Sequence, residues 1–346
     1  MPTLPELTTA TPRGSRARSG RTGPLLVIGA GSVGTRHAQN LGALGFEDLL
    51  FYRTGHGAPQ REGRSTTDLD EALALQPAAA LVCNPTALHV ETALLAARSG
   101  CHLFIEKPVS HALDGLDALA AEVAARRLVV LVGYQFRFHP GLRRVKEWLA
   151  EGAIGEVTSA RARWGEYLPG WHPGEDYTKS YSARRELGGG VVVTLSHPFD
   201  YLRWLLGEVV EVSAQTGQRG GFELDVEDTA NVLLRFESGV LASVSLDYVE
   251  RPASHRLHLV GRNGLISWDG ITGVARLHDA ARGEVQSVSP PPGFDRNSMF
   301  LDEVKHFMAC VRGRERPACG LDDGVAALRI ALAAKRSAEE GLTVRV

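Results

Sequence analysis

The stretch Pro24-Leu-Leu-Val-Ile-Gly-Ala-Gly-Ser-Val-Gly34 decides the fold of this chain. Its apolar residues 25–28 predict a buried strand, and a helical pattern follows Gly29, Gly31 and Gly34. The first glycine permits a tight turn, the second lets the backbone approach a pyrophosphate, and the third lets the helix pack on the strand. The helix N-terminus offers free N–H groups to the phosphates. We therefore predict dinucleotide binding; a glycine-rich turn without a ligand is the plainer alternative.

Length, charge and cysteine content limit the class of protein. The 346 residues are enough for two domains, and a net charge of −2 gives no attraction to nucleic acid or to a membrane. No apolar run approaches the ~20 residues of a membrane span. Four scattered cysteines suit neither a disulfide framework nor a zinc site, so we expect a cytoplasmic protein without metal. Residues 1–23, rich in Thr, Pro, Gly, Ser and Arg, predict a disordered basic tail rather than a secretory signal.

Strands and helices alternate over residues 24–140. Apolar runs at 48–52, 78–82, 102–105 and 128–132 predict further strands, and helices are expected to begin at Thr86 and at Ser110. This alternation is typical of an α/β Rossmann domain with a parallel sheet, whose ligands bind at the carboxyl ends of the strands. Asn84, Lys107 and Tyr134 fall at those ends.

The end of the second strand predicts which cofactor is preferred. About twenty residues past the glycines, an NAD enzyme usually places an acid that binds the ribose 2′-hydroxyl. This chain has Tyr52, Arg53 and Thr54 there, and the last two suit a 2′-phosphate by charge and hydrogen bonding. The sequence therefore favours NADP. In the alternative, Arg53 only stacks on the adenine and either cofactor binds.

Lys107 is the first candidate for chemistry. It stands before Pro108 at a strand end on the cofactor side. Its ammonium is a movable point charge that can hold the oxygen of a substrate alcohol or carbonyl. A solvated loop lysine is the alternative.

Four motifs resemble those of the glucose–fructose oxidoreductase/inositol dehydrogenase/MocA family: residues 29–34, 84–89, 106–108 and 133–138. The resemblance implies that Lys107 lies beside the nicotinamide and contacts the reacting oxygen, and that the Lys107–Pro108 peptide is cis. It also implies that Asn84, Pro85, His89 and Glu106 line the cofactor. Together with the positions argued from the residues themselves, this gives two sets of expected contacts. The cofactor is expected to touch Gly29, Gly31, Ser32, Val33, Gly34, Arg53, Thr54, Asn84, Pro85, His89, Glu106, Lys107 and Gln135. The substrate is expected to touch Lys107, Tyr134, Arg137, Trp164, Trp171, Tyr181, Thr194 and His197.

A second pattern begins near residue 141. Apolar segments separated by Ser238-Gly239 and Asn263-Gly264 predict hairpins, hence a largely antiparallel sheet in an α+β domain over 141–346. Helices are expected at 142–149, 298–312 and 321–340. They would cover one face of this sheet; in the alternative, the last helices pack back on the first domain. The other, open apolar face predicts an oligomer interface. The family resemblance likewise implies homodimers or homotetramers through this sheet.

The segment 168–181 is a long polar and aromatic loop, which in a compact domain is usually functional. Trp171 and Tyr181 offer ring faces and hydrogen-bonding groups suited to a sugar or cyclitol. An ordinary lid or an oligomer contact is the alternative.

The segment 187–204 resembles the second motif of the family, with a glycine cluster followed by one apolar helix. His197 and Asp200 share a face of that helix, and a neutral His197 can accept the hydroxyl proton as hydride leaves carbon. In the alternative, His197 is a core histidine with Asp200 as its partner. Many members carry an aspartate where this chain has Val193, so either Thr194 contacts the substrate or the substrate differs.

These motifs together predict an NAD(P)-dependent oxidoreductase. Hydride would move between the nicotinamide and a hydroxyl or keto carbon of a sugar, cyclitol or nucleotide-sugar, with Lys107 and His197 as the catalytic residues. Two alternatives remain at this point. One is a glycosidase on the same fold that works through transient oxidation by bound NAD, and the other is a non-catalytic sensor that binds the cofactor.

Overall fold

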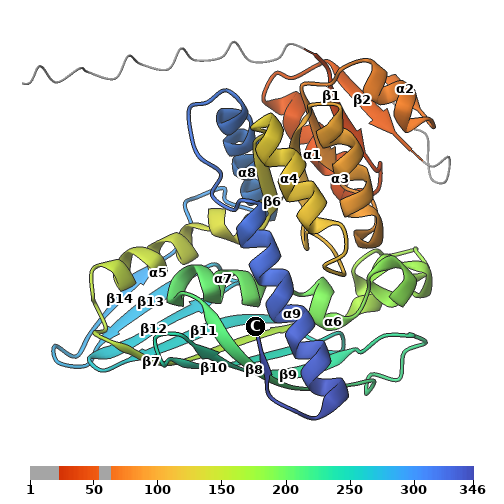
Figure 1. Cartoon of the computed structure of the whole chain (residues 1–346). Helices are drawn as coiled ribbons and strands as arrows, with labels where there is room; N and C mark the ends of the chain where they lie inside the picture. Colours follow the sequence, from red (N-terminus) through yellow and green to blue (C-terminus); the bar gives the residue numbers. More distant parts are fainter. Residues whose placement is uncertain (1–22, 54–63) are drawn as a thin grey trace, which may run out of the picture.

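The computed structural model describes residues 23–53 and 64–346, which form two lobes (Figure 1). The predicted basic tail and Thr54 lie outside these residues. The first lobe holds a six-stranded parallel sheet of order β3-β2-β1-β4-β5-β6, the strand order of a dinucleotide-binding Rossmann fold. Its strands are β1 (Leu25–Ile28), β2 (Leu49–Tyr52), β3 (Arg64–Thr66), β4 (Ala79–Val82), β5 (His102–Glu106) and β6 (Val130–Gly133). Its helices are α1 (Ser32–Ala43), α2 (Leu69–Ala74), α3 (His89–Arg98) and α4 (Leu116–Arg126).

The first lobe matches the predicted alternation, with three differences. Strand β3 was not predicted, because its residues are polar and mostly exposed, and it joins the sheet only at its edge. Thr86–Leu88 is a single 3₁₀ turn before α3. The helix expected from Ser110 begins at Leu116, because Ser110 makes a local turn with the Ala112 N–H and Gly115 takes a positive φ of 76°.

The second lobe is a nine-stranded sheet of order β14-β13-β12-β11-β7-β10-β9-β8-β15. Each described pair of neighbours is antiparallel except β7 with β10, which confirms the prediction of a largely antiparallel sheet. The predicted hairpins at Ser238-Gly239 and Asn263-Gly264 join β9 to β10 and β11 to β12. The strands are β7 (Val157–Gly165), β8 (Val209–Gly217), β9 (Thr229–Phe236), β10 (Leu241–Asp247), β11 (Ser254–Gly261), β12 (Gly264–Asp269), β13 (Ala275–Asp279), β14 (Glu284–Val288) and β15 (Val344–Arg345).

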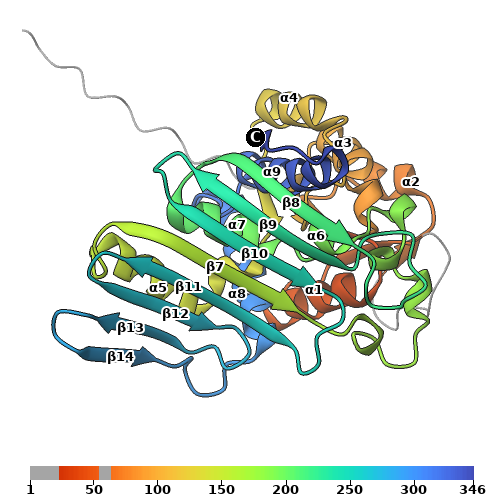
Figure 2. The same cartoon turned by 90° about the horizontal axis from the view of Figure 1, so that it is seen from below.

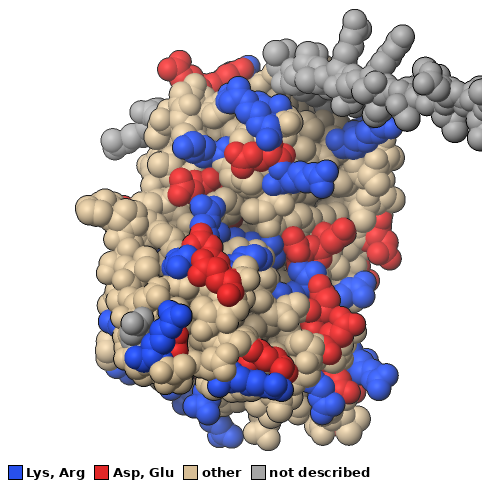
Figure 3. Space-filling view, turned by 90° about the vertical axis from the view of Figure 1, so that its left-hand side faces the viewer, with Lys and Arg blue, Asp and Glu red and all other residues tan. Residues whose placement is uncertain are grey.

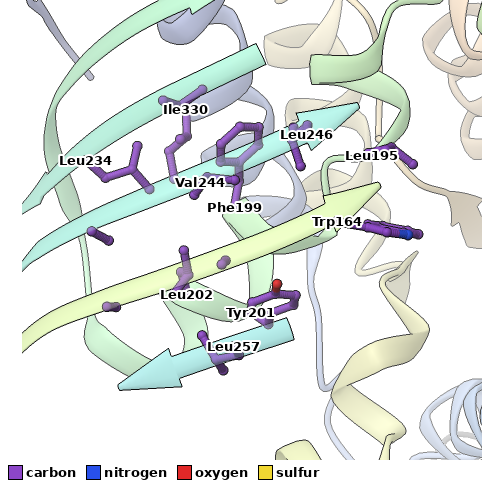
Figure 4. Close-up of a cluster of buried hydrophobic side chains, with 14 of the residues drawn as sticks. Trp164, Leu195, Phe199, Tyr201, Leu202, Leu234, Val244, Leu246, Leu257 and Ile330 are labelled. Atoms are coloured by element: carbon purple, nitrogen blue, oxygen red, sulfur yellow. The ribbon is translucent and has the colours of Figure 1, made fainter. Parts of the chain in front are cut away.

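Helices cover one face of this sheet and enclose the larger hydrophobic core (Figures 1 and 4). They are α5 (Pro140–Ala150), α6 (Val191–Thr194), α7 (His197–Leu206) and α9 (Leu321–Glu340), while α8 (Arg296–Val311) packs on α1 of the first lobe. Side chains such as Phe199 and Leu202 of α7 and Ile330 of α9 lie in this core with Val244 and Leu257 of the strands.

Helix α9 fixes the two lobes relative to each other. Near its start, Gly324 lies so close to Val132 of β6 that an added Cβ would stand 2.7 Å from that side chain. Near its end, the Ser337 hydroxyl accepts a hydrogen bond from the Ala214 N–H of β8 at 2.9 Å. One helix therefore packs on both sheets, which holds the strand ends of the first lobe over the second.

The outer face of the nine-stranded sheet is open (Figure 2). It is less apolar than predicted. Leu233 and Leu241 are 60% and 56% exposed, but Arg161, Ser243 and Arg256 share the same face. The alternation explains this mixture, since every second residue of β9 and β10 points into the core and the others meet solvent.

Charged side chains of both signs are interspersed on the surface seen in Figure 3, without a broad patch of one sign. This distribution agrees with the small net charge. Among the residues that the structure describes, no helix is long and apolar enough to cross a membrane.

Candidate active site

A cavity of about 1500 Å³ lies between the two lobes. Its first wall is made by the carboxyl ends of β1, β4 and β5, which carry Gly29, Asn84 and Lys107. Its second wall comes from α6, α7 and the loop 166–182 of the other lobe. The predicted strand-end site and the predicted loop site are therefore parts of one cavity.

The glycine turn has the geometry that a pyrophosphate requires. Gly29 has a φ of 97°, and a Cβ there would lie 2.7 Å from the Asn84 nitrogen. A Cβ on Gly34 would lie 2.0 Å from the Gly29 carbonyl oxygen, so helix and strand meet there. A Cβ on Gly31 would meet nothing within 4 Å, which leaves open space before the first N–H groups of α1. The residues present thus fit a dinucleotide.

The segment after β5 is held by buried polar contacts. The Glu106 carboxylate lies 2.6 Å from His37 Nε2 and accepts the Lys107 N–H at 3.1 Å. Burial raises the pKa of Glu106, but the hydrogen bond and charge of His37 together with the charge and N–H of Lys107 outweigh that effect, so the net pKa lies below the ordinary value. His89 lies 2.9 Å from both the Pro108 and the Asn84 carbonyl oxygens, which ties the ends of β4 and β5 together.

Lys107 links the two lobes. The Lys107–Pro108 peptide is cis, as predicted. The Lys107 ammonium donates a hydrogen bond to the Thr194 carbonyl oxygen at 2.7 Å, across the cavity that both residues line. Since His197 follows Thr194 by three residues and lines the same cavity, the ammonium and the imidazole lie at the same end of it.

His197 is buried, at 1% exposure, and begins α7. Aromatic rings surround it, with Phe136 at 4.8 Å and Trp164 at 5.3 Å between ring centroids. Neither imidazole nitrogen has a hydrogen-bond partner among the described residues. Burial, followed by the charge of Lys107, holds the pKa of His197 well below its ordinary value. At neutral pH the imidazole is therefore uncharged and can accept a proton.

One prediction and one alternative about this segment need correction. It is two helices rather than one, because α6 ends at Thr194 and α7 starts at His197. Asp200 is not the partner of His197. Its carboxylate pairs with the Arg137 guanidinium, at 2.6 Å to Nη2 and 3.1 Å to Nε.

Arg137 and Tyr134 also differ from their predicted roles, because neither lines the cavity. Arg137 is 4% exposed and bonds Asp200 of α7, Asp323 of α9 and the Ala318 carbonyl. The Tyr134 hydroxyl lies 3.3 Å from the Ser196 hydroxyl in the core. Both residues hold α7 in place behind the cavity, and we remove them from the substrate-binding set.

Arg137→Met is expected to lower the free energy of unfolding by about 3 kcal/mol, because it leaves the buried Asp200 carboxylate without its counter-charge. Chemical denaturation measures this loss. The matched control is Arg137→Met combined with Asp200→Leu, which removes both charges and should recover most of the stability. An unchanged single variant would contradict the proposed structural role.

The remaining candidates line the cavity except Gly34, which is packed against Gly29 behind it. Several of their buried polar atoms have no partner among the described residues. These are Asn84 Oδ1, Gln135 Oε1 and Trp171 Nε1. The cavity lining of predicted residues comprises Gly29, Gly31, Ser32, Val33, Arg53, Asn84, Pro85, His89, Glu106, Lys107, Gln135, Trp164, Trp171, Tyr181, Thr194 and His197.

Some lining residues were not predicted. Ser180, with an unpartnered hydroxyl, and Arg296 carry no motif that would single them out. Arg36 could have been found, because it follows Ser32 by four residues and so shares its helix face. Asp68 reaches the cavity beside Arg53 through the unpredicted strand β3. No group of three or more His, Cys, Asp or Glu that could hold a metal occurs within residues 23–53 and 64–346.

Comparison with known families agrees with this geometry. Residues 25–134 match the oxidoreductase family with an NAD-binding Rossmann fold, and residues 142–267 match the GFO/IDH/MocA C-terminal domain. The chain belongs to the GFO/IDH/MocA family. It is therefore an NAD-binding oxidoreductase, and the predicted family and activity class are confirmed.

Relatives of this GFO/IDH/MocA protein span nearly its whole length. The myo-inositol 2-dehydrogenase of Thermotoga maritima is 29% identical, over 92% of this chain and 97% of that protein. GenD2 from gentamicin A biosynthesis, solved with NAD, is 25% identical with a TM-score of 0.78, over 98% and 99% of the two chains. Levoglucosan dehydrogenase, solved with NADH and levoglucosan, shares the fold at a TM-score of 0.83 and 20% identity, over 93% and 99% of the chains.

Proposed function

We propose that this protein is a dehydrogenase or reductase acting on a hydroxyl or keto carbon of a sugar, cyclitol or nucleotide-sugar. One observation carries the proposal. The Lys107 ammonium of the first lobe reaches the Thr194 carbonyl of the second, three residues before the buried and neutral His197. A cation and a base from separate lobes thus line one cavity that also contains the glycine turn.

The chemistry divides between these residues. When bound, the nicotinamide cofactor accepts or supplies the hydride. The Lys107 ammonium exchanges its bond to the Thr194 carbonyl for one to the substrate oxygen, and so stabilises negative charge that develops there. The neutral His197 imidazole accepts the hydroxyl proton during oxidation and returns it during reduction. Glu106 and His37 keep the lysine segment in position.

Features of the cavity support a hydroxyl-rich substrate. Trp171 and Tyr181 contribute aromatic side chains, and the unpartnered atoms of Gln135, Trp171 and Ser180 need hydrogen-bond partners. A sugar hydroxyl can both donate and accept a hydrogen bond, so it can pair with unpartnered donors and with unpartnered acceptors. Relatives named myo-inositol 2-dehydrogenase and 1,5-anhydro-D-fructose reductase agree with this class.

The test is a panel of cyclitols, free sugars, glycosides and nucleotide-sugars, read by absorbance of reduced nicotinamide in both directions. We expect turnover with at least one hydroxyl or keto compound. Cleavage of a glycoside without net change in absorbance would instead indicate the glycosidase chemistry. Tight cofactor binding without turnover of any compound would favour a sensor.

We further propose a preference for NADP over NAD. Arg53 is half-buried at the carboxyl end of β2 and lines the cavity, where a guanidinium suits a 2′-phosphate. The neighbouring Asp68 carboxylate is engaged by the Asp70 and Glu71 N–H groups at the start of α2. Both bonds are made to Asp68 Oδ1, so that oxygen is less available to a ribose 2′-hydroxyl. Thr54, also expected to contact the phosphate, lies outside the described residues.

Arg53→Ala is expected to raise the Kd for NADPH by about 10- to 100-fold, the effect of losing a hydrogen bond between charged groups, and to change the Kd for NADH by less than about twofold. Fluorescence titration of the reduced cofactors measures both constants. Equal losses for the two cofactors would refute the preference and leave Arg53 as an adenine contact.

We propose a homodimer or homotetramer that associates through the outer face of the nine-stranded sheet. This face is open, with Leu233 and Leu241 exposed on it. Light scattering of the purified protein measures the oligomeric state.

We also propose a cytoplasmic location, which is supported by the four cysteines, because they are free and buried.

A further inference from the structure

Two arginines line the cavity between the glycine turn and His197. Arg36 comes from α1, one turn after Ser32, and Arg296 is the first residue of α8. The helices are joined by reciprocal side-chain bonds between Asn40 and Asn297, at 2.9 and 3.3 Å. This packing brings two guanidinium groups from distant parts of the sequence to the same wall of the cavity.

Aromatic packing holds Arg36 in place. Its guanidinium carbon lies 4.7 Å from the centre of the Phe300 ring, and Phe300 also lines the cavity. Phe300 lies in turn 5.8 Å from the His37 ring. The Arg36 head group is thus positioned by stacking rather than by a carboxylate, and no side chain among the described residues accepts a hydrogen bond from it.

Neither arginine forms an ion pair with any residue in 23–53 or 64–346. The nearby acids are engaged elsewhere. Glu106 is bonded to His37, and Asp295 caps α8 by accepting the Ser298 N–H at 2.8 Å. Burial, and then the charge of Arg296, lower the pKa of Arg36, and the charges of Glu106 and Asp295 offset this lowering only in part.

We propose that Arg36 and Arg296 form a binding site for an oxyanion of the bound ligands. A guanidinium binds carboxylate or phosphate oxygens in a bidentate manner, and two of them facing one cavity wall match such a group. The anion has two possible sources with the same chemistry, namely the cofactor pyrophosphate and a carboxylate or phosphate on the substrate. The second source rests on the proposed function and would narrow its substrates to sugar acids, sugar phosphates or nucleotide-sugars.

Each arginine lies toward one of these two sources of the anion. Arg36 shares the helix face of Ser32, at the predicted pyrophosphate site. Arg296 acts electrostatically on His197 and His255, at the substrate end of the cavity. An oxyanion held between them would lie along the path from the phosphates to the reacting carbon.

The experiment uses Arg36→Met and Arg296→Met, with Arg296→Lys to retain charge without the planar fork. Arg276→Met is the matched control, because Arg276 is exposed on β13 and does not line the cavity. One arm measures the Kd of NADH by fluorescence at low and high salt. The other measures, by calorimetry on the NADH-loaded protein, binding of D-glucuronate and D-glucose 6-phosphate against D-glucose and myo-inositol.

Loss of one charged hydrogen-bonding group should weaken binding of the anion by about 10- to 100-fold. Weaker NADH binding, more pronounced at low salt, assigns the pair to the pyrophosphate. Weaker binding of the acidic sugars alone assigns it to the substrate. If Arg36→Met and Arg296→Met both stay within about twofold of Arg276→Met in both arms, the oxyanion site is refuted. Neither arm requires turnover, so failure of the proposed function gives a different result.

Discussion

Lys107→Met is expected to lower kcat by about 10³-fold while leaving the Kd for reduced cofactor within about twofold, since a lost electrostatic donor at the reacting oxygen has an effect of this size. The ammonium lies at the substrate end of the cavity, bonded to the Thr194 carbonyl. Its removal leaves the developing charge on the substrate oxygen without a stabilising cation. The glycine turn, the predicted pyrophosphate site, follows a different strand and is expected to keep its shape.

His197→Asn should give a loss of about 10²- to 10⁴-fold in kcat, typical of a missing general base. The kcat of the double variant Lys107→Met/His197→Asn should be little lower than that of the slower single variant, because the two groups act on one oxygen. Stopped-flow absorbance of reduced nicotinamide measures the rates, and fluorescence titration measures cofactor binding. Lys305→Met, an exposed position on α8, is the control. Turnover at the wild-type rate in Lys107→Met would remove Lys107 from the mechanism.

His139 and His255 together are expected to lower the free energy of unfolding by about 4 kcal/mol between pH 7 and pH 5. Burial lowers the pKa of His139 to about 4 and that of His255 to about 3. In the unfolded chain both titrate near 6.5. Below pH 6.5 the unfolded state therefore binds more protons than the folded state, and each histidine destabilises the fold by about 2 kcal/mol at pH 5.

The surroundings of the two histidines support a loss of stability as the pH falls. His255 stacks on Trp164 at 4.5 Å, and His139 packs against Trp268 at 5.0 Å, in a cluster of rings that also receives the charge of Arg296. His139 Nδ1 accepts the Gly141 N–H at 3.0 Å and so caps α5. Protonation would remove that acceptor as well as place a charge among aromatic rings.

Urea denaturation at several pH values measures this dependence. His139→Asn is the matched variant, because asparagine keeps an acceptor for the α5 cap and does not titrate. It should reduce the loss between pH 7 and pH 5 by about 2 kcal/mol. If the stability of His139→Asn falls between pH 7 and pH 5 as much as that of the wild type, His139 gains its proton in the folded state as readily as in the unfolded chain, and the prediction is wrong.

Much of the candidate site could be predicted from the sequence because its residues lie in local motifs. Gly29, Asn84 and Lys107 each follow a short buried strand, and parallel strands bring such ends to one edge of the sheet.

The roles of Arg137 and Asp200 were harder to predict from the sequence. A charged residue beside a motif looks the same in sequence whether it faces a ligand or a buried counter-charge, and the fold directs Arg137 to Asp200.

The sequence alone determined the two lobes, the glycine turn and the lysine at the strand end, since strand periodicity, glycine turns and helix starts are local properties. The tertiary structure decided that Lys107 meets Thr194, that Asp200 neutralises Arg137, and that Arg36 faces the same cavity as Arg296. Each of these pairs joins residues separated by more than sixty positions. The packing of α6, α7 and α9 on the second sheet and of α8 on α1 brings them together, because electrostatic and hydrogen-bonding partners are set by distance in space rather than along the chain.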